Sequence, residues 1–243
     1  MIARIAGYYQ FELRLLARNG ESLLLVAGLP ILLLVFFSTV EVLPTGAAQD
    51  PVDVLVPGIV TLAVFSTGFV NLAISTGFDR QYGALKRLGA SPLRRGELIC
   101  SKLAVVATVT IAQAVTLLSV GRVLGWRGTI DFGDLSLGMA LGATAFTGAA
   151  LLLAGRLPGV AALATANAIY IVALLISGLL IPLAELPATL RTIAYALPTG
   201  ALVEITTGAT GGADASTRAW LVLAAWAVLT PPLAARLMRW APN

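Results

Sequence analysis

Three amide side chains lie within apolar stretches of this sequence and are its first candidates for chemistry. Asn71 and Asn167 each lie seven residues from one end of an apolar run, and Gln113 lies deeper in a third run. An amide in hydrocarbon needs a partner, and hydrogen bonds between helices there contribute about 0.6 to 2 kcal/mol. All three can therefore be packing contacts. Asn71 and Asn167, at an equal depth of roughly 10 Å, can also line a cavity.

The residue types that are missing exclude several kinds of site. The sequence has no histidine, which excludes metal sites, haem ligation and general bases built on histidine. Its one cysteine, Cys100, excludes an intramolecular disulfide and any metal site made of paired cysteines. Apart from Lys102, near the start of the third run, the apolar runs hold no Asp, Glu, Lys or Arg, whereas ion-coupled carriers use an ionisable group at membrane depth. We expect no catalytic, metal or cofactor site on this chain.

The elements that carry these amides are apolar and long. The sequence is 58% hydrophobic and 12% charged, with a mean hydropathy of +0.91, whereas soluble domains carry about 25% charged residues. A helix needs about 20 apolar residues to cross a bilayer. Six runs meet this requirement and predict an all-α membrane protein with six transmembrane helices, at about residues 22–40, 54–78, 98–121, 135–154, 160–181 and 219–235.

The loop after the second run, residues 79–97, is rich in basic residues and has a short helical pattern between Gly83 and Gly89. Ser91 and Pro92 then predict the N-cap and first turn of the next helix. A helix with an apolar edge and a basic edge favours contact with another protein, whereas a plain charged anchor at the membrane surface needs only the charges. The apolar side chains are Tyr82, Leu85 and Leu88, and the basic ones are Lys86 and Arg87.

Two further segments accompany the spans. Residues 1–21 predict a cytoplasmic amphipathic helix in the plane of the membrane surface, because apolar residues recur on one face at Ile2, Ile5, Tyr9, Leu13 and Leu16. Residues 182–218 are too apolar for a plain loop and predict a re-entrant segment in the outer leaflet. Within it we expect one short helix at 186–198 between prolines, a second at 200–206, and a surface loop at 208–212.

The basic residues predict the orientation of the chain. Loops on the cytoplasmic side of a membrane are enriched in Lys and Arg. With six spans, twelve of the 16 Lys and Arg residues lie on one side, which also holds both termini. We therefore expect a multi-pass protein of the cytoplasmic membrane with both termini in the cytoplasm. The net charge of +4 reflects this topology and contact with lipid headgroups, and it does not predict a nucleic-acid partner.

No phosphate-binding GxxxxGK[ST] sequence occurs in the chain. Its two lysines, Lys86 and Lys102, lack the preceding glycines that such a loop requires. If transport is active, ATP and Mg²⁺ are expected on another chain.

The basic loop resembles the signature that follows the second span of type-2 ATP-binding cassette (ABC) transporter permeases. Ala84 replaces the usual threonine, Lys86 replaces the usual arginine, and Lys102 follows at the expected place. The resemblance extends over the whole chain, and the composition is similar to that of small drug- and antibiotic-export permeases of actinobacteria. The residues that match the signature are Asp79, Arg80, Gly83, Ala84, Leu85, Lys86, Arg87, Leu88 and Gly89.

The resemblance implies that these residues couple the chain to an ATPase. Residues 83–89 would be a coupling helix seated in a groove of the ATPase, with Leu85 and Leu88 buried against that partner. Two permease copies, with a homodimer favoured, would join two ATPase copies. The second and fifth spans would line a path for a hydrophobic or amphiphilic substrate such as a drug or lipid. The candidate path residues are then Asn71, Asn167 and Gln113.

Two alternatives remain open from the sequence. An ATP-independent carrier or channel would transport without any ATPase. A non-transporting membrane protein, such as an assembly factor or a membrane enzyme, would need another site. For an enzyme, only acidic residues of the expected outer side could contribute, and nothing orders them: Glu185, Glu204 and Asp214.

Overall fold

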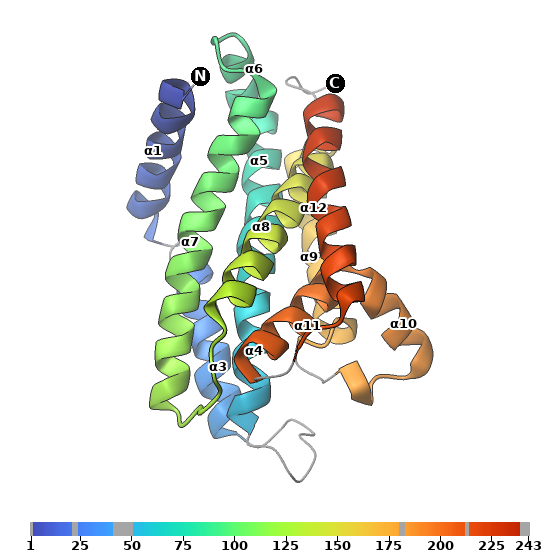
Figure 1. The fold of residues 1–243 in the computed structure, drawn as a ribbon. Coiled ribbons are helices and arrows are strands. Elements are labelled where there is room, and N and C mark those ends of the chain that lie inside the picture. The colour runs from blue at the N-terminus through green and yellow to red at the C-terminus, as the bar shows by residue number, and fades with distance from the viewer. Residues whose placement is uncertain (1, 21–23, 41–50, 180–182, 212–213, 239–243) are drawn as a thin grey trace.

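The computed structural model describes residues 2–20, 24–40, 51–179, 183–211 and 214–238, and these form a helical bundle without a strand (Figure 1). The elements, in chain order, are α1 (Ile2–Arg18), the π-helical η1 (Leu24–Gly28), α3 (Leu29–Thr39), α4 (Pro51–Phe65), the π-helical η2 (Ser66–Asn71), α5 (Leu72–Gln81), α6 (Ala84–Gly89), α7 (Arg95–Val123), α8 (Phe132–Ala154), α9 (Gly159–Ile176), the 3₁₀ helix η3 (Leu183–Glu185), α10 (Ala188–Ala196), α11 (Pro198–Gly211) and α12 (Thr217–Leu237).

Five helical stretches are long and apolar enough to cross a membrane, and they correspond to five of the six predicted spans. α4, η2 and α5 form one continuous stretch of 30 residues, Val52–Gln81, and the others are α7, α8, α9 and α12. The predicted first span, 22–40, includes residues outside the described part of the chain. Its described part is η1 followed by the shorter apolar helix α3. The predicted first span, 22–40, therefore stays a prediction.

α9 ends earlier than its apolar run predicts. The helix stops at Ile176, and Gly178 has a left-handed φ of +78°. Glycine adopts this conformation without the steric cost that a side chain would add, so it allows the chain to leave the helix. The last two residues of the predicted span, 180 and 181, lie outside the described residues.

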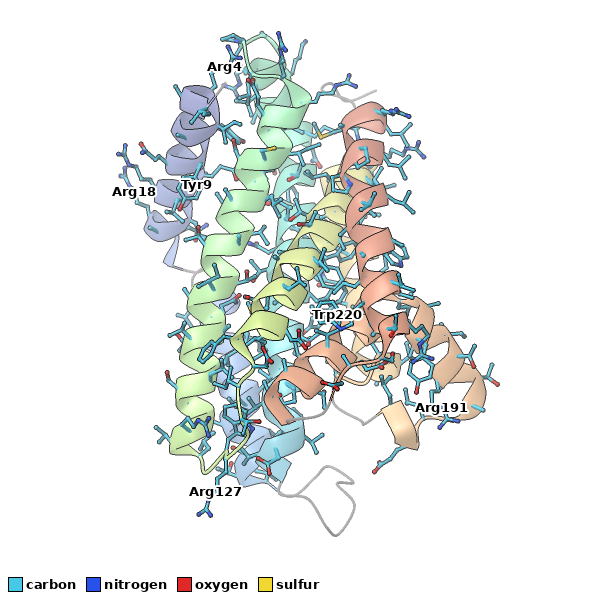
Figure 2. The ribbon with its side chains drawn as sticks, in the orientation of Figure 1. Arg4, Tyr9, Arg18, Arg127, Arg191 and Trp220 are labelled. Carbon is cyan, nitrogen blue, oxygen red and sulfur yellow. The ribbon has the colours of Figure 1, made fainter. Side chains whose placement is uncertain are left out.

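The described ends of the chain share one end of the bundle with α6. Figure 1 shows the start of α1, the whole of α6 and the end of α12 at one end, with α10 and α11 toward the other. Arg4 lies at the α6 end and Arg127 lies at the opposite end (Figure 2). This arrangement agrees with the predicted topology, in which both termini and the basic loop share the cytoplasmic side.

Small residues let α8 approach two neighbours closely. The space that a side chain on Gly148 would need is filled by Thr230 and by the backbone of Pro231 in α12. Thr230 Oγ1 also lies 2.9 Å from the carbonyl oxygen of Ala145, where it can donate a hydrogen bond. The glycine pair of α8 packs instead against α11, with Gly138 beside Ile205 and Gly142 beside Leu202. α8 is thus buried between α11 and α12.

The segment before the last span contains the two short helices predicted for it. α10 begins directly after Pro187, and α11 begins at Pro198. The surface loop predicted at 208–212 is wrong for residues 208–211, which form the last turn of α11; Gly212 lies outside the described residues. Thr210 is buried and donates to the carbonyl oxygen of Thr206 at 2.7 Å, and Ala209 accepts from the backbone N–H of Asp131 at the same distance. These contacts outweigh the low helix propensity of glycine.

Candidate functional site

The basic loop forms the predicted short helix, α6, between two longer ones. Gly83 precedes it with a left-handed φ of +74°, which reverses the chain after α5. The predicted helix start at Ser91 is wrong: α7 begins at Arg95, with Arg94 as its N-cap. Ser91 Oγ instead donates to the carbonyl oxygen of Leu88 at 2.6 Å and so forms part of the turn between the helices. The Glu97 carboxylate accepts a hydrogen bond from the Arg94 backbone N–H at 2.9 Å. This backbone group, at the start of α7, has no partner within the helix.

Leu85 does not face outward from α6. Its side chain is 0% exposed and packs with Leu98 at the start of α7 and Met238 after α12. The expectation that Leu85 is buried against a partner protein is therefore wrong, because the chain itself covers it. Leu88 is only partly buried and packs at the edge of the same cluster.

The outward surface around α6 is polar and aromatic. Tyr82 is 70% exposed and stacks on Phe78, with the ring centroids 6.0 Å apart. Lys86, Arg87 and Gly89 are also exposed. A partner that docks at this end would meet these residues.

Asp79 and Arg80, the first two residues that match the signature, lie at the end of α5, shortly before α6 in the chain. Arg80 is 4% exposed, and its Nη1 donates to the carbonyl oxygens of Ala154 and Leu157 at 3.4 and 3.3 Å. Asp79 Oδ2 lies 4.0 Å from Lys102 Nζ. Both residues thus join α5 to its neighbours, and Arg80 holds the C-terminal end of α8, where carbonyl groups lack partners within the helix.

A buried cation links α1 to α7. Lys102 is 2% exposed, and its Nζ lies 2.5 Å from Glu12 Oε1 and 5.9 Å from the centre of the Tyr8 ring. Burial, together with the nearby Glu12 carboxylate, raises the pKa of Tyr8 well above its ordinary value, so its hydroxyl stays neutral. The sequence identified Lys102 through the permease signature but did not predict its burial. No neighbouring residue in the chain indicates that α1 covers it.

α1 packs lengthwise along α7 (Figure 2). Arg4 Nη2 donates to Glu97 Oε1 at 2.7 Å, and this hydrogen bond raises the pKa of Arg4 above its usual value. Farther along both helices, Tyr9 Oη lies 3.0 Å from Thr108 Oγ1. The predicted amphipathic helix is present, but this placement does not support an orientation in the plane of the membrane surface.

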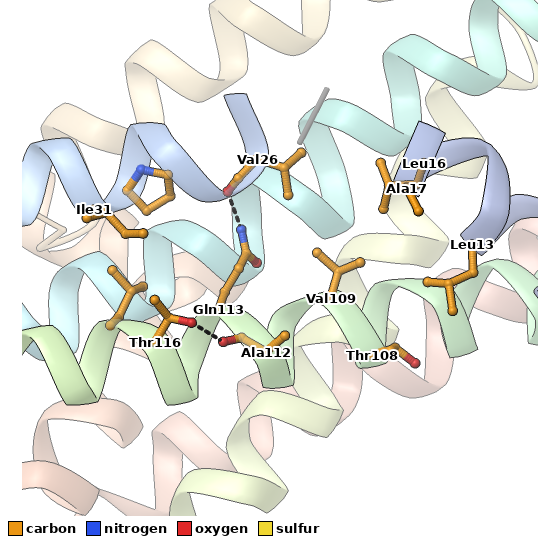
Figure 3. Close-up of a pocket in the computed structure, with 12 residues that line it drawn as sticks. Leu13, Leu16, Ala17, Val26, Ile31, Thr108, Val109, Ala112, Gln113 and Thr116 are labelled. Atoms are coloured by element: carbon orange, nitrogen blue, oxygen red, sulfur yellow. Dashed lines mark hydrogen bonds between the residues drawn. The ribbon is translucent and has the colours of Figure 1, made fainter. Parts of the chain in front are cut away.

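Gln113 joins three segments through both ends of its amide. It is 5% exposed, and its Nε2 donates to the carbonyl oxygen of Val26 in η1 (Figure 3). Its Oε1 accepts from Thr67 Oγ1 in η2 at 3.0 Å. Both partners lie in π-helical turns, which occur mostly as single turns within α-helices and often at functional sites. These are the contacts of a packing residue, although Gln113 also lines a largely apolar cleft of about 240 Å³ between α1, α3 and α7.

The two asparagines occupy different surroundings. Asn71 is half-buried and lines a cleft of about 180 Å³ together with Glu12, Asp79 and Lys102. Asn167 is exposed on α9. α5 and α9 pack against each other through small residues, including Gly77 and Gly159. The asparagines therefore lie on two neighbouring helices that correspond to the second and fifth predicted spans.

A comparison with protein families gives one match. A family model described as "ABC-2 type transporter" matches residues 8–209, from within α1 to within α11. The matched range includes α6, the buried Lys102 and all three amides. No curated protein matches the chain.

Proposed function

The chain belongs to the ABC-2 type transporter family and is thus a permease subunit of an ABC transporter; from this premise we propose that it exports a hydrophobic or amphiphilic substrate. The observation that carries the proposal is the family match over residues 8–209, joined to a short helix at the expected cytoplasmic end of the bundle. Drugs and lipids are the substrate classes that fit a path through apolar spans. The small drug-efflux permeases of actinobacteria are the nearest type by composition.

ATP would be bound and hydrolysed by a separate ATPase subunit. Membership of the family implies an ATP-binding partner, and the sequence has no loop of the GxxxxGK[ST] type to cradle phosphates. We place ATP and Mg²⁺ on two ATPase copies, joined to two copies of this permease, with a homodimer favoured. The complex would lie in the cytoplasmic membrane with both permease termini in the cytoplasm.

Coupling would pass through α6. Tyr82, between α5 and α6, and Lys86 and Arg87 of α6 form the exposed surface that the ATPase would contact. Leu85 fixes the helix to α7 and to Met238 after α12. Arg80 would hold the end of α5 on α8, and Asp79 would hold it near Lys102 of α7. Ala84, Leu88 and the flanking Gly83 and Gly89 complete the coupling segment. The roles thus divide between residues that meet the partner and residues that hold the helix in place.

The path would run along the exposed sides of α5 and α9, closed by the same helices of the second copy. Asn71, the last residue of η2 directly before α5, and Asn167 on α9 would supply amide groups to this path. Gln113, whose amide nitrogen and oxygen each have a partner within the chain, would act by holding η1 and η2 in position.

Charge reversal on α6 tests the coupling. We expect the double substitution Lys86→Glu and Arg87→Glu to abolish co-purification of the ATPase and substrate export, while membrane levels stay at those of the parent. Reversal adds repulsion where deletion would remove only an exposed pair worth about 0–1 kcal/mol. Arg127→Glu, exposed at the opposite end of the bundle, is the matched control and should leave both measurements unchanged.

Two results would contradict the proposal. A charge-reversed variant that binds the ATPase and exports like the parent would show that α6 is only a charged anchor. Robust ATP hydrolysis by the purified permease alone would show that the ATPase activity does not lie on another chain.

A further inference from the structure

A cavity lined mostly by arginine lies at the end of the bundle that carries α6. It has a volume of about 530 Å³. Its arginines come from four places in the chain, which are the end of α5, the start of α7, the turn after α8 and the end of α12. The residues that line it are Arg80, Arg95, Arg156, Arg236, Leu237 and Met238. No carboxylate is among these lining residues.

Two of the arginines, Arg156 and Arg236, bring positive charge to the cavity without an ion pair in the described part of the chain. Arg95 Nη1 donates to the carbonyl oxygens of Ala235 and Arg236 at 3.3 and 3.4 Å, as Arg80 does at the end of α8. Carbonyls at a helix C-terminus carry about half a negative charge in total, which does not balance the two further guanidinium groups of Arg156 and Arg236. Arg156 and Arg236 are exposed, and the ion pairs found in the described part of the chain do not include them. Such a cavity attracts an anion.

A second, apolar cavity adjoins the first. It has a volume of about 730 Å³, lies between α8, α9 and α12, and shares Arg156 with the arginine cavity. Ile169 and Val172 of its α9 wall are 40% and 54% exposed, so this wall is accessible from the hydrocarbon of a membrane. Its other walls include Phe65, Phe146, Leu153 and Trp226.

We propose that the two cavities together bind an anionic phospholipid of the inner leaflet, with the phosphate among the arginines and an acyl chain in the apolar cavity. Guanidinium groups match phosphate oxygens in a bidentate geometry, and basic pockets between membrane helices suit anionic headgroups. A free phosphate ion would use only the arginine cavity. The lipid is bound, not exported, so the inference goes beyond the proposed function. Only the name of the leaflet rests on the predicted topology.

Lipid binding can be measured on the purified permease without any ATPase. The chain in detergent is titrated with phosphatidylglycerol, with phosphatidylcholine of the same acyl chains, and with inorganic phosphate. Native mass spectrometry gives the bound fraction, and thermal unfolding gives the stabilisation. We expect phosphatidylglycerol to bind at least about tenfold more tightly than phosphatidylcholine, because its headgroup has no cation to oppose the arginines. Inorganic phosphate at the same concentration should not raise the melting temperature.

Substitution of the two exposed arginines locates the site. We expect Arg156→Gln with Arg236→Gln to weaken phosphatidylglycerol binding by about tenfold per arginine and to leave phosphatidylcholine binding unchanged. The matched control is Lys86→Gln with Arg87→Gln, which removes the same number of charges at the same end but outside the cavity; it should bind like the parent. If the double variant does not fold, single Arg156→Gln tests the residue that both cavities share.

Each remaining outcome decides against the proposal. Equal retention of the two phospholipids by the parent would exclude a site for anionic headgroups. Unchanged preference in the arginine variants would place the lipid elsewhere. A full stabilisation by inorganic phosphate alone would indicate a small-anion site without an acyl chain. Loss of export in the charge-reversed α6 variant has no bearing on these measurements, so the two proposals fail separately.

Discussion

The Lys102 side chain is 2% exposed, and its Nζ forms ion pairs with the carboxylates of Glu12 and Asp79. Removing one partner of a buried ion pair leaves the other charge uncompensated and typically costs about 3–5 kcal/mol. We expect Lys102→Met to lower the free energy of unfolding by about 3 kcal/mol and to detach α1 from α7. Thermal unfolding in detergent measures the loss.

A double-mutant cycle separates this ion pair from simple misfolding. Adding Glu12→Gln to Lys102→Met should recover part of the lost stability, because it removes a carboxylate that the first change left unpaired. Lys86→Met, at an exposed lysine, should have no effect on unfolding. Equal melting temperatures for Lys102→Met and the parent would show that the pair contributes nothing to stability.

The amides should respond differently to the same substitution. Gln113→Leu removes two hydrogen bonds and leaves the Val26 carbonyl without its partner, so we expect a loss of about 1–2 kcal/mol in stability. Asn167→Leu, on an exposed face, should leave unfolding unchanged and alter substrate-stimulated ATPase activity or export selectivity. If Asn167→Leu instead lowers the melting temperature and leaves ATPase stimulation and export selectivity unchanged, its amide is a packing contact.

At the scale of residues, the sequence identified the polar groups but not their partners. The apolar runs show directly that Gln113 lies within a span, because hydropathy is a local property. Its partner Val26 accepts through a carbonyl in a π-helical turn, and no residue type marks such a turn. Lys102 was likewise visible as a motif residue, whereas its burial depends on how α1 docks along α7.

At the scale of elements, Gly148 determines how closely α8 and α12 approach. A side chain there would meet Thr230 and the backbone nitrogen of Pro231, 2.6 Å from the added carbon. Backbone cannot move aside as a flexible side chain can, so we expect Gly148→Val to destabilise the protein by about 1–3 kcal/mol or more. The midpoint of thermal unfolding checks this.

The control for this change is another helical glycine with open space around it. Gly96, in the first turn of α7, has nothing within 4 Å of the position of an added side-chain carbon. Gly96→Ala should preserve or raise stability, because alanine favours a helix by up to about 1 kcal/mol over glycine. Equal tolerance of Gly148→Val and Gly96→Ala would show that the α8–α12 packing adjusts freely.

The helices themselves were largely predictable, since long apolar runs and prolines act locally. α6 was expected between its glycines, and α10 between its prolines. The buried side of α6 was not, because spacing reveals an apolar edge but not the neighbour that covers it. Met238, which covers Leu85, lies at the far end of the chain. The last turn of α11 was missed because its glycines favour a loop and only tertiary contacts stabilise the helix there.

At the scale of the whole molecule, the direction of insertion is open to a direct test. In a Cys100→Ser background we expect Arg127→Cys to react with an impermeant thiol reagent in intact cells. Lys86→Cys should react only after the membrane is ruptured. Both positions are exposed and lie at opposite ends of the bundle, so accessibility within the protein does not decide the result. The reverse pattern of labelling would invert the topology.

The packing of Leu85 has a mechanical consequence. Because its side chain fills the space between Leu98 and Met238, pulling α6 away from the bundle would open a void, which cores resist. We therefore expect α6, the start of α7 and the end of α12 to move together as one rigid unit. Under the proposed function, force that an ATPase applied here would tilt α7 and α12 and displace their far ends, at the opposite end of the bundle.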